Sequence, residues 1–121
     1  MPSINEVIER VDRNKPNTFD EQTKASWLAR VDGRISVEIL KEDPPTLYTY
    51  PEDGDKDLLV KEPFDNLYDH YLEAMIDYTN KEFANYNNSM LMYNEAMDSF
   101  AKWYIRNNVP KSASNFRNVM G

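Results

Sequence analysis

The repeating pattern that decides the fold lies in residues 64–105, FDNLYDHYLEAMIDYTNKEFANYNNSMLMYNEAMDSFAKWYI. Apolar and aromatic side chains recur there at spacings of three and four, the period of a helix that buries one broad face. The polar run Asn87-Asn88-Ser89 interrupts the pattern, and Pro110 follows its end. The stretch predicts two long helices, residues 63–87 and 89–108, which a short polar connection folds back as an antiparallel αα-hairpin.

Two further helices are predicted upstream. Ser3-Ile4-Asn5-Glu6 fits a capping box, and an apolar stripe continues it, so a first helix spans residues 3–14. Thr18-Phe19-Asp20-Glu21 repeats the signature and opens a second helix, residues 19–41, before Pro44-Pro45. The predicted fold class is all-α, a single small four-helix domain over residues 1–121 built on the long hairpin. The expected buried residues of the first two helices are Ile4, Val7, Ile8, Val11, Ala25, Leu28, Val31, Ile35, Ile39 and Leu40.

Residues 42–62, between the second and third helices, form an acidic arm without helical periodicity. Leu47-Tyr48-Thr49-Tyr50 and Leu58-Leu59-Val60 flank an acidic, glycine-containing segment. This order suits either an extended excursion or a short β-hairpin-like arm. A connection of this length in so small a domain is usually functional or mobile.

The composition narrows the class of protein. A chain of 121 residues suits one domain. It has no run near the roughly 18 apolar residues that span a bilayer, and its start lacks the order of a signal peptide, so a cytoplasmic protein without membrane contact is expected. The absence of cysteine excludes disulfides, thiolate nucleophiles and cysteine-ligated metals.

The net charge of −7 is unevenly distributed. Residues 42–69 contain nine acidic and two basic side chains, whereas residues 102–121 contain four basic and no acidic ones. Either these charges solvate exposed loops, or the basic tail of residues 109–121 and the last helix meet the acidic arm of another copy. The interface residues expected from the second reading are Asp53, Asp55, Asp57, Lys102, Arg106, Lys111, Phe116 and Arg117.

No catalytic, cofactor-binding or metal-binding residue is predicted. His70 is the only histidine and is expected to be structural or on the surface. Asp69, Glu73 and Asp77 follow one another at intervals of four on the third helix, which is typical of a solvated face. The run of aspartates from Asp53 departs from a calcium loop, which has glycine at its sixth position. A glycine-rich phosphate loop is absent, and the acidic balance disfavours specific binding of nucleic acid.

Several segments resemble one family of viral assembly proteins. They are Trp27-Leu28 with Val31-Asp32-Gly33-Arg34-Ile35, Leu58-Leu59-Val60 with Pro63-Phe64-Asp65-Asn66-Leu67-Tyr68, and Tyr86-Asn87-Asn88-Ser89 with Phe100-Ala101-Lys102-Trp103-Tyr104. Together these segments resemble the head-tail connector, or adaptor, proteins of tailed bacteriophages and prophages, over about residues 3–108.

The resemblance implies a non-enzymatic, mainly helical subunit that forms a ring, commonly of twelve copies, in the virion or in the cytoplasm of the bacterial host. Such a ring joins the phage portal to head-completion or tail proteins around the DNA channel, with at most non-specific proximity to DNA. The alternative is a small helical regulator that binds another protein as a monomer or dimer. An enzyme using carboxylates of the third helix is a third, weaker hypothesis.

Overall fold

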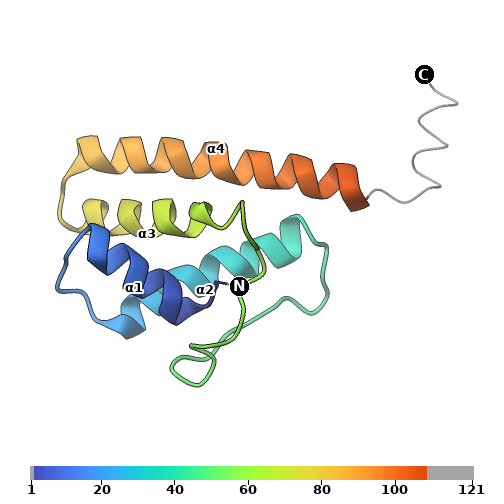
Figure 1. Cartoon of the computed structure of the whole chain (residues 1–121), viewed down its shortest axis with the longest axis horizontal. Coiled ribbons are helices and arrows are strands. Elements are labelled where there is room, and N and C mark those ends of the chain that lie inside the picture. The colour runs from blue at the N-terminus through green and yellow to red at the C-terminus, as the bar shows by residue number, and fades with distance from the viewer. Residues whose placement is uncertain (1, 109–121) are drawn as a thin grey trace, which may run out of the picture.

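The computed structural model describes residues 2–108 of the chain (Figure 1). This part contains four helices, α1 (Ile4–Asn14), α2 (Glu21–Glu38), α3 (Asn66–Thr79) and α4 (Phe83–Asn108). The predicted all-helical class is therefore confirmed over the described residues. β-type pairing within them is limited to one isolated bridge between Ser3 and Asp57, so the arm between α2 and α3 contains no β-hairpin, and its residues 50–55 form turns. The predicted tail lies outside the described residues.

Helix α3 lies at the centre of the molecule. Figure 1 shows α4 running back along one side of α3, while α1 and α2 lie on its other side. Helix α3 contacts each of the other three helices, and α1 also contacts α2. Among the helices, α4 makes close backbone contacts with α3 alone within the described residues. It therefore forms an outer layer.

The core lies between α1, α2 and α3. The apolar stripe predicted for α1 is confirmed, since all four of its side chains are buried. The arm contributes to the same core, because Leu58 and Val60 are only 2% and 0% exposed. Buried apolar side chains of the three helices are Ile4, Val7, Ile8, Val11, Ala25, Leu28, Val31, Ile35, Leu67, Leu72, Ala74 and Ile76.

The first two helices begin with side-chain caps. The hydroxyl of Ser3 accepts a hydrogen bond from the Glu6 amide at 3.2 Å, as the capping-box pattern predicts. Helix α2 begins at Glu21 rather than at residue 19, because the carboxylate of Asp20 accepts from the Thr23 amide at 2.7 Å. It ends at Glu38 rather than at residue 41, before Lys41 adopts a left-handed φ of 59°.

The predicted boundary between the last two helices is wrong. The turn lies at residues 80–82 rather than at Asn87-Asn88-Ser89, which are part of α4. Lys81 has a left-handed φ of 62°, and the Glu82 amide donates to the Asp77 carbonyl at 2.8 Å, which closes the end of α3. The predicted start at residue 63 is also early, because α3 begins at Asn66. As a result α3 has 14 residues and α4 has 26.

A buried carboxylate joins the arm to the helices. Asp32 of α2 is fully buried, and its Oδ1 accepts a hydrogen bond of 2.5 Å from the Tyr68 hydroxyl of α3. Its Oδ2 accepts from the Tyr48 hydroxyl at 2.8 Å and from the Leu59 amide at 2.9 Å. The Tyr68 hydroxyl accepts in turn from the Val60 amide at 2.8 Å. One polar cluster thus connects α2, α3 and both ends of the arm.

Replacing Tyr68 by phenylalanine tests this cluster. The variant leaves one oxygen of Asp32 and the Val60 amide without their buried partner, so the free energy of unfolding should fall by about 2–4 kcal/mol. Urea denaturation followed by circular dichroism measures the change. Tyr78→Phe is the matched control, because Tyr78 lies on the same helix and is 54% exposed. Equal stability of the two variants would contradict the role given to Tyr68.

Candidate functional site

The acidic segment of the arm is held against the start of α1. The Asn5 amide donates to the Gly54 carbonyl at 3.0 Å, and the Asn5 side chain donates to Asp55 at 2.8 Å. The side-chain oxygen of Asn5 accepts from the Tyr50 hydroxyl at 3.0 Å. Asn5 therefore fixes the acidic segment at three points.

Gly54 leaves room for the Asn5 side chain in this close approach. A Cβ atom at Gly54 would lie 2.7 Å from the side-chain nitrogen of Asn5, closer than real Cβ contacts. Asp53 is half-buried and accepts from the Thr49 amide at 2.8 Å, so its carboxylate serves the loop itself. Asp55 and Asp57 are exposed. Of the three predicted acidic interface residues, these two are the ones whose side chains lie open at the surface.

The predicted basic residues lie on a different part of the molecule. Lys102 is exposed and pairs with Asp98 one turn earlier at 3.0 Å, and Arg106 is exposed in the last turn of α4. Figure 1 shows α4 on the side of the molecule opposite the acidic loop, so one copy does not bring the two groups together. The remaining predicted interface residues, Lys111, Phe116 and Arg117, lie outside the described residues.

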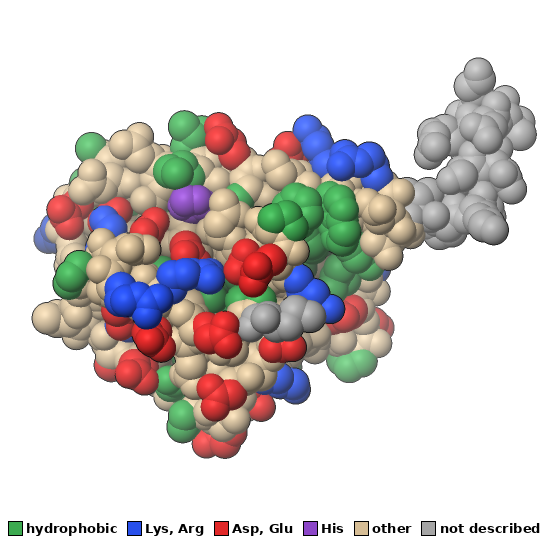
Figure 2. All heavy atoms as spheres, viewed as in Figure 1, with side chains coloured by type: hydrophobic (Ala, Val, Ile, Leu, Met, Phe, Trp, Pro, Cys, Tyr) green, Lys and Arg blue, Asp and Glu red, His purple; other side chains and the backbone are tan. Residues whose placement is uncertain are grey.

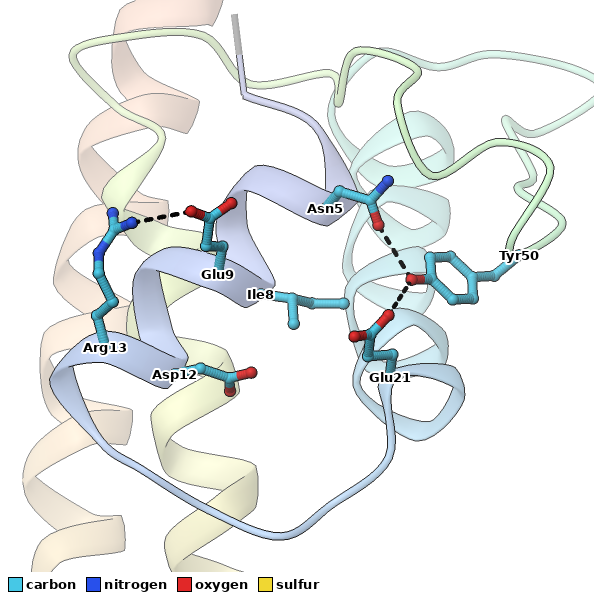
Figure 3. A pocket seen from close by; sticks show the side chains of 7 residues that line it. All are labelled: Asn5, Ile8, Glu9, Asp12, Arg13, Glu21 and Tyr50. Atoms are coloured by element: carbon cyan, nitrogen blue, oxygen red, sulfur yellow. Dashed lines mark hydrogen bonds and ion pairs between the residues drawn. The ribbon is translucent and has the colours of Figure 1, made fainter.

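A polar pocket of about 580 Å³ lies between α1, the start of α2 and the arm (Figure 3). The Tyr50 hydroxyl shares its one proton between Glu21, at 2.8 Å, and Asn5. Arg13 donates to Glu9 at 3.1 Å. Asp12, at the edge of the pocket, pairs with the buried Lys24 at 2.8 Å. These polar groups pair with one another, which joins the arm to the helices.

The buried Asp32 cluster has shifted pKa values, as catalytic groups often do, but it is closed to solvent. Burial raises the pKa of the Asp32 carboxyl despite its three hydrogen bonds. Burial and the neighbouring carboxylate also raise the pKa of Tyr68 and of Tyr48. Asp32 and Tyr68 are both 0% exposed, so a substrate has no access to them. We therefore assign the cluster a structural role.

The raised pKa of Asp32 predicts a specific pH dependence of stability. An acid whose pKa is raised by folding binds its proton more tightly in the folded state. Its contribution to the free energy of unfolding falls as pH rises from the unfolded pKa of about 3.9 through the folded value. Asp32→Asn cannot titrate, so the stability deficit of this variant should be largest at acid pH and narrow as pH rises.

Urea denaturation of the parent and of Asp32→Asn at pH values from acid to neutral measures this deficit. The other titrating groups are common to both proteins, so the difference isolates Asp32. Asp55→Asn, on the exposed loop, is the control. A deficit of Asp32→Asn that widens with pH would contradict the prediction.

The carboxylates of α3 are not the solvated face that their spacing predicted. Asp69 accepts two hydrogen bonds from Arg10 of α1, one of them at 2.7 Å. Asp77 is fully buried and pairs with Lys15 at 2.7 Å. The spacing of four places Asp69 and Asp77 toward α1 and its C-cap residue Lys15, so that cations neutralise both carboxylates. Within residues 2–108, no group of histidine, cysteine, aspartate and glutamate side chains has the arrangement of a metal site.

Helix α4 carries the apolar surface that the sequence pattern did not reveal. Only Tyr93 and Phe100 of its 26 residues are buried. On the outside, Leu91 is 58% exposed and Ile105 is 56% exposed. The methionine and aromatic stripe of α4, Met90, Tyr93, Met97, Phe100 and Tyr104, packs against the core, and the exposed apolar side chains lie outside this stripe. Because α4 packs along one other helix, its outer face stays in water.

Comparison with protein-family models, curated proteins and solved structures finds no match to this chain. None of the helices over residues 2–108 has the length and apolar character needed to cross a membrane.

Proposed function

We propose that the protein is a structural head-tail connector subunit of a tailed bacteriophage or prophage. It acts by binding, without catalysis: copies associate into a ring, and the ring joins the portal to head-completion or tail proteins around the DNA channel. The observation that carries this proposal is the outer helix α4, which exposes the large apolar side chains Phe83, Leu91, Met92, Trp103 and Ile105.

One seam of α4 points directly away from the core. Leu91, Glu95, Asp98, Lys102 and Ile105 follow one another at spacings of four and three, which places them on one face of the helix. Leucine and isoleucine stand at the ends of this seam, and the Asp98–Lys102 pair lies between them. This seam is suited to packing against another polypeptide, with the ion pair fixing its register.

A second apolar surface lies on a different part of the molecule. Leu47 at the start of the arm is 75% exposed, and Val37 of α2 is 49% exposed. Both line a shallow groove of about 660 Å³ that also includes Pro45 and Gly33. A ring requires contacts between two different patches of neighbouring copies, and the α4 seam and this groove are two such patches.

The distribution of charge supports the same head-to-tail contact. Asp55 and Asp57 are exposed on the loop, whereas Lys102 and Arg106 are exposed on α4. Opposite charges on separate surfaces of one copy attract when a neighbour brings them together, and they disfavour contacts between like surfaces. They thus favour a repeating arrangement over a two-fold dimer.

Light scattering at several concentrations, with and without the portal protein of the same genome, tests the proposed function. We expect a discrete ring, or a stoichiometric complex that appears only with portal. Leu91→Glu should abolish this association, because it places a charge in the α4 seam. Asn85→Glu adds the same charge to the same helix outside the seam and should associate normally. A monomer that ignores portal at every concentration would refute the proposal and favour a regulator.

Charge reversal tests the head-to-tail contact. Replacing Asp55 and Asp57 by lysine, or Lys102 and Arg106 by glutamate, should weaken association by about tenfold, or ~1.4 kcal/mol. A mixture of the two variants should recover affinity, because each supplies the charge that the other lacks. Glu82→Lys, which changes an exposed acid in the α3–α4 turn, is the control. Unchanged association of both reversed variants would remove this contact from the proposal.

A further inference from the structure

An aromatic cavity lies under the C-terminal end of α4. Its volume is about 480 Å³, and its lining comes from the end of α2, the last part of the arm and the last turns of α4. Figure 2 shows hydrophobic side chains gathered on this part of the surface. The residues used below are Lys61, Glu62, Phe64, Phe100, Trp103 and Asn108, all of which line the cavity.

The cavity presents an aromatic surface that is open on one side. The ring of Phe64 lies 5.3 Å from that of Trp103 and 6.1 Å from that of Phe100, measured between centroids. Trp103 nevertheless remains 39% exposed. Aromatic rings pack favourably edge to face or offset at 4.5–7 Å, so the geometry suits the insertion of one further ring.

The chain itself supplies such a ring. The described structure ends at Asn108, which lines the cavity, and 13 residues follow in the sequence. Among them Phe116 is the only aromatic residue. Phe116 follows Asn108 by eight positions, and a segment of this length spans at most about 29 Å when extended. A segment that starts at the edge of the cavity needs only to turn back for Phe116 to enter it.

We infer that this cavity is the docking site of Phe116, in the C-terminal segment of the same chain. Tethering favours this occupant over the tail of a second copy, because a short linker gives an effective concentration of about millimolar. The lining carries one acid, Glu62, and one base, Lys61, so its own charge is balanced. The negative end of the α4 dipole beside the cavity favours a segment that contains Lys111 and Arg117 and no acid.

The inference goes beyond the proposed connector function and does not depend on it. A subunit that docks its tail and never assembles would support this inference while refuting the proposed function.

Fluorescence quenching of Trp103 tests the inference in the full-length chain. Trp27→Phe leaves Trp103 as the only tryptophan. In this background Phe116→Ala should raise the acrylamide quenching constant about twofold, because the ring no longer covers the indole. Ser114→Ala, in the same tail, should leave the constant unchanged. Circular dichroism checks that all three proteins keep the same helical content.

The concentration dependence identifies the occupant. Protection of Trp103 that is independent of protein concentration supports docking within one chain. Protection that appears only as concentration rises shows that the tail of a second copy fills the cavity and overturns the inference. Equal quenching constants for Phe116→Ala and its parent at every concentration also overturn it.

Discussion

The buried carboxylate of Asp32 is the interaction on which the rest of the structure depends. It accepts hydrogen bonds from Tyr68 on α3, from Tyr48 at the start of the arm and from the Leu59 amide at its end. A buried charge without partners would be strongly destabilising, so these donors must stay in place once the core has closed. An arm with almost no regular backbone pairing is thereby given one conformation, and it contributes apolar side chains to the core.

The packing of the arm against the helices determines which side chains remain at the surface. Helix α4 covers one side of the core formed by α1, α2, α3 and the arm. It contributes two buried side chains and the partly buried Met90, Ala96, Met97 and Tyr104. The loop on Asn5 holds acidic groups on one side of the molecule, and α4 presents apolar and basic groups on the other. One core thus produces two unlike surfaces, and this is the property on which the proposed assembly relies.

The sequence predicted features that are encoded locally. The apolar stripe of α1 and its cap at Ser3 follow from spacing and from side-chain chemistry within one turn. The turn at Lys81 could not be predicted in this way, because Phe83 and Tyr86 continue the helical period across it. Periodicity alone therefore cannot locate the break between α3 and α4. The role of Asp32 could be suspected only from its place between Leu28 and Ile35 on an apolar face, since its partners are distant in sequence.

The single-sided packing of α4 has a consequence for local dynamics. A helix that contributes few buried side chains can separate from the body at a lower free energy than global unfolding, and its amides then exchange with solvent sooner than those of α1 or α3. Any partner that covers the outer face of α4 also holds the helix in place. Association and the local folding of α4 are therefore linked equilibria, and each stabilises the other.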